Sequence, residues 1–481
     1  MTIRLSHYIA GAPRPSSGGA ALLDLNPSDA TDVVAELPAG TPVDAAAAVA
    51  AAAEALPAWR RLTGPARADH LHRWAAAIEA RSEEMAQGMA REVGKPIAEA
   101  RGEVGRCVVI LRYYAGEAVR AVGEVVPPQA AGALQFTLRE PLGVVALITP
   151  WNFPLAIPLW KAAPALAFGN TVVLKPSEQS PVMALLLAET AQAAGLPAGV
   201  FNVLLGGGAQ VGEALLRSPE VRGASFTGSA AVGARVAAIG AERNIRYQTE
   251  MGGKNVVLVM PDADLDLAAR LTAAGAMRYA GQKCTATSRA VVARQVETAF
   301  LDKLRAQVTG MLLGPVTDPA AAIGPVISAA ARERIRSALA TAKGEVVCGG
   351  VEETGGGFRQ GFFVAPTVVR GVEPGSPLAQ EELFGPVLAV LSVDGLDEAL
   401  SVANRSRYGL SASLFTRDIA AALRYINQIE VGLVRVNGDT TGVDPHAPFG
   451  GMKGSSSGSR EQGSAAREFY TETKTVQVHP A

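Results

Sequence analysis

The chain has 481 residues, of which 48% are hydrophobic and 19% are charged, and its formal net charge is −1 at pH 7. This length suits roughly three domains or two large ones, and the low charged fraction indicates surface that is covered in a homo-oligomer. Because the chain has no basic surplus, we expect a small-molecule partner and neither nucleic acid nor a membrane.

Cysteine content and apolar runs indicate the redox compartment of the protein and whether a segment spans a membrane. Three cysteines are too few for a disulfide framework, and no C-x-x-C pair indicates a metal. We therefore expect a reducing, cytoplasmic compartment, and no signal peptide is evident before Pro13. Residues 141–160 are apolar enough to span a bilayer, but Pro150, Pro154 and Pro158 would break a helix, so we interpret them as a strand, a turn and a helix start.

The predicted elements begin with the alanine-rich run 44–56, which we interpret as a helix with Asp44 as its N-cap. From residue 143 onward, short apolar runs alternate with helical segments, as in a parallel sheet covered by helices on both faces. The expected strands are 143–149, 170–176, 201–207 and 223–229, and the expected helices between them are 155–168, 180–195 and 209–217.

A second α/β unit is expected from residue 255. Its expected parts are strand 255–260, helix 264–280, the loop GQKCTATS at 281–288 and strand 289–293. Two later runs are rich in glycine: we interpret 349–361 as a surface connection, and 450–463 has the composition of a flexible linker. A last strand is expected at 473–478.

Polar residues follow three of the strands expected in the first sheet. These are TPWN at 149–152, KPSE at 175–178 and FTGS at 226–229. In open parallel sheets, ligands bind beyond the carboxyl ends of the strands, so these segments are candidate binding residues. The glycines Gly228 and Gly233 do not form a G-x-G-x-x-G motif and are weak support for a dinucleotide site by themselves.

Cys284, in the loop 281–288, is the candidate nucleophile. A free cysteine alone is more often a small core residue, and it becomes a nucleophile when it is ionised and reachable. A Cys/His hydrolase is an alternative, although none of the five histidines lies in a recognisable cysteine-protease signature; they are His7, His70, His72, His446 and His479.

Two further residues have both a chemical and a structural interpretation. Glu250 lies at a probable strand end before two glycines, where it is either a general base or a solvated loop acid. The amide of Asn152 either donates to an oxyanion or caps the turn TPWNFP.

Taken together, seven motifs resemble the aldehyde dehydrogenase superfamily over about residues 8–478. They are PWNFPL (150–155), LKPSE (174–178), FTGS (226–229), EMGGKN (250–255), GQKCTATSR (281–289), EELFGPV (381–387) and PFGGMKGS (448–455). The resemblance implies an α/β fold with a Rossmann-type cofactor domain, an α/β catalytic domain and a small β arm for oligomerisation.

The resemblance also implies domain limits and an assembly. The NAD(P)-binding domain would comprise 1–119 and 139–251, the catalytic domain 252–450, and the oligomerisation arm 120–138 and 467–481. The exposed backbone of the last strand would add to the sheet of a neighbouring subunit in a homodimer or homotetramer.

By the same resemblance, Cys284 attacks an aldehyde carbon, and the Asn152 amide and the Cys284 backbone N–H stabilise the thiohemiacetal oxyanion. Hydride transfer to the nicotinamide leaves a thioester, which water activated by Glu250 hydrolyses to the acid. Lys161 and Glu461 are expected to relay the proton. The presence of Glu250 favours hydrolysis over release to coenzyme A, and the intact set argues against a silent structural or binding member of the family.

The implied cofactor is NAD, with NADP as the alternative. Lys175 and Glu178 would hold the adenosine ribose, and the helix N-terminus after Gly228 would face the pyrophosphate. A Glu178 carboxylate near the 2′ position would repel the extra phosphate of NADP. The full expected set is Thr149, Pro150, Trp151, Lys175, Ser177, Glu178, Phe226, Thr227, Gly228, Ser229, Gly233, Gly252, Glu382 for the nicotinamide ribose and Phe384 beside it.

The substrate is expected from the segments 280–289 and 442–476, which are most similar to α-ketoglutaric semialdehyde (2,5-dioxopentanoate) dehydrogenases. Arg278 either pairs with a substrate carboxylate or is a surface or helix-capping arginine. Trp160 stands where some succinic semialdehyde dehydrogenases carry arginine, which argues against that substrate. An aromatic or aliphatic aldehyde is the alternative.

Overall fold

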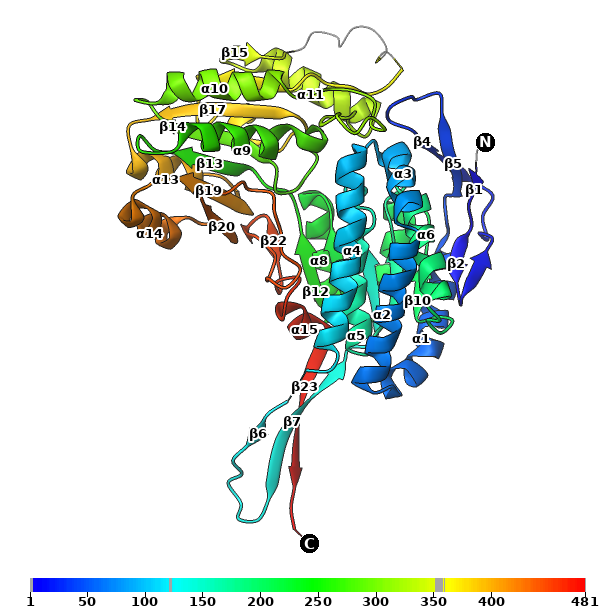
Figure 1. The fold of residues 1–481 in the computed structure, drawn as a ribbon. Helices are drawn as coiled ribbons and strands as arrows, with labels where there is room; N and C mark the ends of the chain where they lie inside the picture. Colours follow the sequence, from blue (N-terminus) through cyan, green and yellow to red (C-terminus); the bar gives the residue numbers. More distant parts are fainter. Residues whose placement is uncertain (1–2, 121–122, 351–357, 359, 481) are drawn as a thin grey trace.

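The computed structural model describes residues 3–120, 123–350, 358 and 360–480. Two α/β bodies lie side by side, and a narrow β arm that carries the C-terminal strand projects from them (Figure 1). Within the described residues, no helix combines the length and the apolar character needed to cross a membrane.

The first body is built on an eight-stranded sheet in the order β22-β12-β11-β8-β9-β10-β2-β3. Its five central strands are parallel, and the strands at both edges are antiparallel. The strands are β22 (Ser456–Ser457), β12 (Arg246–Glu250), β11 (Val221–Thr227), β8 (Val144–Ile148), β9 (Thr171–Lys175), β10 (Phe201–Val203), β2 (His7–Ile9) and β3 (Ala12–Arg14).

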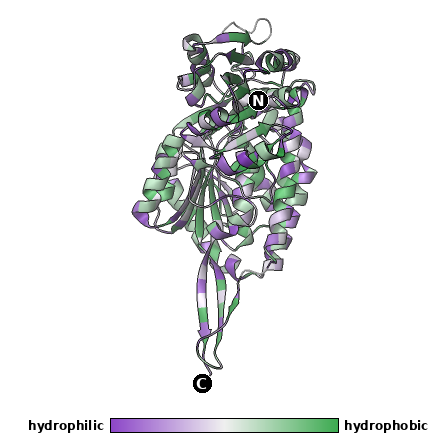
Figure 2. Ribbon diagram, turned by 90° about the vertical axis from the view of Figure 1, so that its left-hand side faces the viewer, coloured by the Kyte–Doolittle hydropathy of each residue, from purple (hydrophilic) through white to green (hydrophobic). Residues whose placement is uncertain are grey.

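Helices cover both faces of this sheet. Along β8, Val144 and Ala146 face one core and Val145 and Leu147 face the other, because successive side chains of a strand alternate in direction. The first face packs against α1 (Pro42–Arg61), α7 (Glu213–Arg217) and α8 (Ala230–Arg243). The second packs against α2 (Gly64–Ala80), α3 (Ser82–Val93), α4 (Ile97–Glu117), α5 (Ala156–Ala167) and α6 (Pro181–Ala193). Strands with apolar residues on both faces therefore form the middle of the body, as the mostly green central strands of Figure 2 show.

Helix α1 confirms the helix predicted at 44–56 but corrects its start. Thr41 is the N-cap, and its side chain accepts from Asp44 N at 3.2 Å. Asp44 is the third helical residue, and its carboxylate accepts in return from Thr41 N at 3.0 Å. This reciprocal capping box satisfies two backbone donors, so Asp44 is not the N-cap that the sequence predicted.

The second body is built on a seven-stranded sheet in the order β15-β16-β17-β14-β13-β19-β20, parallel except for β15. Its strands are β15 (Glu345–Cys348), β16 (Thr367–Arg370), β17 (Val387–Val393), β14 (Thr287–Ala293), β13 (Asn255–Val259), β19 (Ser411–Phe415) and β20 (Leu433–Val436). Its helices are α9 (Leu265–Met277), α10 (Glu297–Thr309), α11 (Ala329–Thr341), α12 (Pro377–Gln380), α13 (Leu396–Asn404) and α14 (Ile419–Gln428).

The arm is a three-stranded antiparallel sheet in the order β23-β7-β6. The strand β23 (Thr471–Val478) confirms the predicted last strand and pairs with β7 (Leu134–Pro141) over its full length, and β6 (Val125–Val126) pairs with the other side of β7. Helix α15 (Ala465–Tyr470) leads into β23. Two small sheets complete the described structure: β1 (Ile3–Arg4), β5 (Val33–Pro38) and β4 (Ala21–Leu25), and β18 (Tyr408–Gly409) with β21 (Met452–Lys453).

Two other sequence interpretations differ from the structure. The helix expected at 209–217 is a π-helical turn, η1 (Gly208–Gly212), followed by the short α7. The segment 450–463 is not a linker, because it contributes β21 and β22 and buries Ser455 and Glu461. The predicted surface connection at 349–361 lies largely outside the described residues. The strands and helices expected at 143–207 and 255–293 are confirmed with small shifts in most ends, but the strand expected at 201–207 already ends at Val203.

Candidate active site

The candidate site lies where the order of the first sheet reverses. The chain runs from β8 through β9 to β10 in one direction, then returns to β11 on the other side of β8. Ligands bind at such a switch point, beyond the carboxyl ends of the two strands. The register pairs Ile148 with both Lys175 and Phe226, and Thr227 with Glu250. The three predicted segments and Glu250 therefore share one edge.

Cys284 is carried to this edge by a strained turn. Helix α9 is followed by η2 (Arg278–Gly281), in which Tyr279 and Ala280 have φ values of 53° and 51° and Gly281 has 65°. Two consecutive left-handed residues that are not glycine carry a conformational cost, which persists only where the surroundings impose it. A Cβ on Gly281 would lie 2.3 Å from the oxygen of Gly385, so this position requires glycine.

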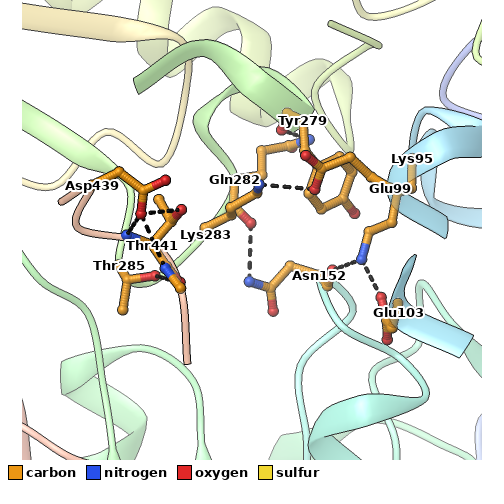
Figure 3. A network of polar contacts seen from close by, with 11 residues as sticks. Lys95, Glu99, Glu103, Asn152, Tyr279, Gln282, Lys283, Thr285, Asp439 and Thr441 are labelled. Carbon is orange, nitrogen blue, oxygen red and sulfur yellow. Dashed lines mark hydrogen bonds and ion pairs between the residues drawn. The ribbon is translucent and has the colours of Figure 1, made fainter. Parts of the chain in front are cut away.

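Side-chain amides fix the backbone on both sides of the thiol, and Figure 3 shows the first of these contacts, from Asn152 to Gln282. Asn152 Nδ2 donates to the carbonyl of Gln282 at 3.0 Å, and the buried Gln282 side chain accepts from Ile327 N at 2.8 Å. Asn255 Nδ2 donates to the carbonyl of Cys284 at 2.8 Å. Sequence reasoning did not single out Gln282 or Asn255, although both lie inside motifs that carry the resemblance.

Asn152 is held in place from its backbone as well. It is buried, and Lys95 Nζ donates to its carbonyl at 2.7 Å, so Asn152 lies between Lys95 and Gln282 in Figure 3. Lys95 forms a buried ion pair with Glu103, which accepts from Leu155 N and Ala156 N at 3.0 Å each. A solvated turn cap would not be fixed in this way, so the arrangement favours the chemical interpretation of Asn152.

The Cys284 thiol is only partly accessible and lies in an unfavourable field for a thiolate. Burial, together with the nearby carboxyls of Glu382 and Glu250, raises its pKa to about 12. The neutral thiol is therefore the resting form at pH 7, and forming the nucleophile requires a base or a change of surroundings.

Glu250 is buried rather than solvated, which corrects the loop-acid interpretation. Its Oε2 accepts from Ser456 Oγ at 2.5 Å, while Oε1 has no hydrogen-bond partner in the described chain and lies against Gly450, whose added Cβ would be 2.6 Å away. Burial raises the pKa of Glu250 well above its usual range, and the charge of Glu461 raises it further. A carboxyl with a raised pKa is suited to accept a proton from water.

Lys161 and Glu461 form a buried ion pair behind Glu250. Ser225 Oγ accepts from Lys161 Nζ at 2.8 Å and donates to Glu461 Oε1 at 3.1 Å, and Gln248 Nε2 donates to Ser225 Oγ at 2.8 Å. The predicted relay pair is thus brought together, and Glu461 acts electrostatically on Glu250.

A cavity of about 400 Å³ adjoins Cys284 and Asn152. Ten of the predicted residues line it: Asn152, Cys284, Pro150, Trp151, Thr227, Gly228, Ser229, Gly252, Glu382 and Phe384. The rings of Trp151 and Phe384 meet edge to face with centroids 5.7 Å apart. Burial raises the pKa of Glu382 to about 7, and its carboxylate accepts from Gly253 N at 3.2 Å. A Cβ on Gly252 would lie 1.8 Å from Glu382 Oε2, so glycine there allows this carboxylate to reach the cavity.

The turn from β11 into α8 has the geometry of an anion site. Ser229 is the N-cap of α8, so the free N–H groups of the first turn follow it and the helix dipole favours negative charge there. Gly228 packs on the ring of Phe226, and Gly233 packs on Met251, so side chains at these glycines would not fit. Thr227 Oγ1 is buried without a partner in the described chain, which leaves it available to a ligand.

The remaining predicted cofactor residues lie further along the same edge. Lys175 Nζ lies 3.0 Å from Glu178 Oε1, which also accepts from Gly208 N at 2.8 Å. Lys175 is buried, so it is not an ordinary solvent-facing lysine. Ser177 Oγ accepts from Gln179 N at 3.3 Å, and the buried Thr149 donates its backbone N–H to the Lys175 carbonyl at 3.1 Å.

A separate cavity of about 750 Å³ begins on the flank of the thiol loop. Lys283 and Phe153 line it, while their neighbours Cys284 and Asn152 line the first cavity, and the two cavities share no lining residue. The rest of its wall includes Glu99, Gly102, Glu103, Arg106 and Val109 of α4, Arg278, residues 319–322, Thr441, Gly442 and Pro445. Consecutive residues of the thiol loop, Lys283 and Cys284, therefore line different cavities.

The described side chains form neither a metal site nor a hydrogen-bonded Cys/His pair at the thiol. No group of three or more His, Cys, Asp or Glu residues in the described ranges is placed to hold a metal ion. His7 pairs with Asp44 and His70 with Arg73, both far from the thiol in the fold, and no hydrogen bond joins a described histidine to Cys284. This geometry gives no support to a Cys/His hydrolase.

Comparison with known proteins agrees with the arrangement. The model of the aldehyde dehydrogenase family matches residues 15–476. The alpha-ketoglutaric semialdehyde dehydrogenase of Bacillus subtilis is 44% identical over 477 residues, 98% of each chain. The alpha-ketoglutarate semialdehyde dehydrogenase of Haloferax volcanii is 41% identical over 480 residues, 99% of each chain. The solved NAD-dependent aldehyde dehydrogenase from Sinorhizobium meliloti has a TM-score of 0.95 at 38% identity, covering 99% of this chain and 96% of that one, which confirms the predicted fold class. The chain therefore belongs to the aldehyde dehydrogenase family and is an NAD(P)-dependent oxidoreductase that acts on aldehydes.

Proposed function

We propose that the enzyme oxidises α-ketoglutaric semialdehyde to 2-oxoglutarate, with Cys284 as the nucleophile. The observation that carries the proposal is that neighbouring residues of the thiol loop line two cavities. Cys284 lines one together with the expected cofactor residues, and Lys283 lines the other together with Arg106, Arg278 and two carboxylates. Two relatives, at 44% and 41% identity, bear the name of this activity. The cations Arg106, Arg278 and Lys283 suit an aldehyde that carries a carboxylate better than an aromatic or aliphatic one.

In the proposed first step, the Cys284 thiolate attacks the aldehyde carbon. One hydrogen of Asn152 Nδ2 donates to Gln282, which orients the amide and leaves the second hydrogen for the thiohemiacetal oxyanion. The Cys284 backbone N–H is the second proposed donor. Because Asn152 is fixed by Lys95 as well, the donor is preorganised and needs no reorganisation during the reaction.

In the proposed last step, Glu250 removes a proton from the water that hydrolyses the thioester. Its raised pKa suits it to hold that proton. The buried pair of Glu461 and Lys161 behind Glu250 would then relay the proton. A thioester released to coenzyme A would not need this base, so the buried and preserved Glu250 favours the free acid as product.

The residues present fit NAD(P). The unpartnered Thr227 hydroxyl, the N-terminus of α8 and the close approach allowed by Gly252 line one cavity with Glu382 and Phe384. NAD(P), when bound, supplies the hydride acceptor. We propose that the Glu178 carboxylate, held by Lys175 and Gly208, binds the adenosine ribose and repels a 2′-phosphate, so that NAD is preferred over NADP.

We also propose the domain limits and setting expected from the sequence. The NAD(P)-binding domain comprises 1–119 and 139–251, the catalytic domain 252–450, and the oligomerisation arm 120–138 and 467–481. The change of sheet between β12 and β13 and the separate sheet of the arm support these limits. A homodimer or homotetramer in the cytoplasm is the proposed form, supported by the exposed arm and by three free cysteines.

An aldehyde panel tests the proposed function. Purified enzyme is assayed with α-ketoglutaric semialdehyde, succinic semialdehyde, pentanal and benzaldehyde, each with NAD and with NADP. We expect the highest kcat/KM for α-ketoglutaric semialdehyde with NAD, and a higher value for pentanal or benzaldehyde would contradict the proposal. Cys284→Ala should abolish turnover while NAD still binds, as measured by calorimetry, because the thiol forms the covalent bond and does not hold the cofactor.

A further inference from the structure

The wall of the 750 Å³ cavity contains a stripe of helix α4. Glu99, Glu103, Arg106 and Val109 are spaced three or four residues apart and so share one helical face, with Gly102 beside Glu103. Glu103 holds the loop that carries Asn152, through Leu155 N and Ala156 N. Arg106 lies one turn further along the same face, so a molecule in this cavity lies beside both Arg106 and Lys283, the neighbour of Cys284.

In the wall of this cavity the carboxylates of α4 have charged partners, whereas Arg106 has none among the described residues. The two α4 carboxylates in the wall have cationic partners, since Glu99 pairs with Lys283 at 2.8 Å and Glu103 pairs with Lys95. The half-buried Arg106 forms neither a hydrogen bond nor an ion pair with any residue of the described ranges, and its Nε is buried without an acceptor. Buried guanidinium nitrogens are normally hydrogen-bonded, so an acceptor is missing at this place.

The environment of Arg106 favours an incoming anion. Burial lowers the pKa of Arg106, and the charge of the exposed Asp444 acts in the opposite direction without reaching hydrogen-bond distance. Arg278, the candidate from the sequence, is exposed at the same cavity, so water screens it more strongly. Of the two arginines, Arg106 is the better-desolvated partner for a carboxylate.

We propose that Arg106 binds the carboxylate at the end of the substrate away from the aldehyde and thereby selects carboxylate-bearing aldehydes. The proposal rests on the proposed function, in which the aldehyde carbon reacts at Cys284. A planar guanidinium matches a carboxylate through two parallel N–H···O bonds, which neither Lys283 nor a neutral side chain reproduces. The turn at Thr441 and Gly442, fixed by Asp439 through N–H groups at 2.8 and 3.2 Å, forms part of the same wall.

Arg106→Met tests the proposal, because methionine keeps an apolar stem but removes the charge. We expect KM for α-ketoglutaric and succinic semialdehydes to rise about 10- to 100-fold, as for a lost charged hydrogen bond, while kcat and the KM for pentanal change less than about threefold. Arg106→Lys should fall between wild type and Arg106→Met. The matched control is Arg112→Met on the exposed side of α4, where Arg112 pairs with Glu79, and it should behave as wild type.

A second readout is independent of turnover and cofactor. Glutarate, a five-carbon dicarboxylate, should protect Cys284 of the wild-type enzyme from iodoacetamide, and Arg106→Met should raise the half-protecting concentration about tenfold or more. Equal KM increases for pentanal, an unchanged KM for the semialdehydes, or the same effect in Arg112→Met would overturn the role of Arg106.

The two proposals fail separately. If the wild-type enzyme prefers succinic semialdehyde but Arg106→Met weakens both semialdehydes, the proposed substrate is wrong and the role of Arg106 stands. If α-ketoglutaric semialdehyde is preferred, and Arg106→Met leaves its KM unchanged while Arg278→Met raises it, the proposed substrate stands and Arg278 is the carboxylate-binding residue.

Discussion

Glu250 is the residue that separates the two halves of the proposed reaction. Forming and oxidising the thiohemiacetal needs Cys284, the oxyanion donors and the cofactor, whereas only hydrolysis needs a base for water. In Glu250→Gln the amide still accepts from Ser456, so the fold around it is kept. We expect a burst of about one NADH per site followed by a steady rate lower by ~10²- to 10⁴-fold, the usual contribution of a general base.

Rapid-mixing absorbance measures this burst, and mass spectrometry locates the accumulated acyl group on the peptide that contains Cys284. Absence of both burst and adduct would place Glu250 before hydride transfer, as the base that ionises the thiol. An unchanged steady rate would remove it from the mechanism.

The pKa of Cys284 gives a second prediction at this scale. With a pKa of about 12, raised by burial and by Glu382, the reactive thiolate is a small fraction that grows with pH. Alkylation of cofactor-free enzyme by iodoacetamide should therefore accelerate about tenfold per pH unit from pH 7 to 10. Glu382→Gln should lower the pKa and speed alkylation at pH 8. A Cys348→Ser background removes the other partly accessible thiol, and a plateau near pH 7 would contradict the prediction.

At the scale of elements, the loop between β8 and α5 depends on one buried ion pair. Lys95→Met leaves Glu103 buried without its cation, which typically costs about 3–5 kcal/mol of unfolding free energy. Adding Glu103→Gln removes that charge but keeps an acceptor for Leu155 N and Ala156 N, so stability should largely return. Turnover should stay low in the double variant, because the Asn152 carbonyl has still lost its donor.

Urea unfolding measured together with kcat tests this separation of stability from positioning. Recovery of both quantities in the double variant would show that Lys95 acts only on stability. The exposed pair of Arg101 and Glu83 serves as the control, since Arg101→Met should change neither quantity appreciably.

The elements also show which features a sequence can predict. Strands such as β8 and β13 were predictable because strands buried on both faces are continuous apolar runs. The N-cap of α1 was misplaced because Thr41 and Asp44 are both good capping residues and only their geometry separates them. The composition of 450–463 indicated flexibility, but its contacts with the β12 strand and with Lys161 decide its structure.

Site residues were predictable only where a motif carried them. Cys284, Asn152 and Glu250 stand in motifs of the family, and the structure places the first two at one cavity and buries the third. Lys95, in the connection between α3 and α4, and Arg106, on α4, were missed because a cation in such places is usually interpreted as a solvent-facing residue. The pairing of Lys95 with Glu103 and the exposure of Arg106 to a cavity are properties of packing between distant segments.

For the whole molecule, the junction between the two large sheets organises the site. Only residues 251–254 separate β12 from β13, so the end of the first sheet, with Glu250, lies beside the start of the second. The thiol loop enters the second sheet at the same level, because Asn255 pairs with Thr287. Neither body alone therefore contains the full set of reacting groups.

The β arm and helix α14 carry the surfaces from which we predict the assembly of the protein. One edge of β23 pairs with β7 along eight residues, and its other edge has no strand partner in the described chain. Helix α14, which precedes the edge strand β20 in the chain, has Ile419, Leu423 and Ile426 exposed to 72%, 55% and 48%. An open strand edge can pair with a strand of a second copy, and an exposed apolar face can pack against a second copy.

Removing residues 473–481 should therefore convert the proposed homo-oligomer into smaller species, as measured by light scattering after size exclusion at micromolar concentration. Removing only residues 479–481 leaves β23 intact and should not change the mass. Because the arm is a separate sheet, circular dichroism of the shortened chain should keep the signal of the two large sheets, which distinguishes dissociation from unfolding. A full-length chain that is monomeric under these conditions would contradict the proposed assembly, and the exposed face of α14 would then need another explanation.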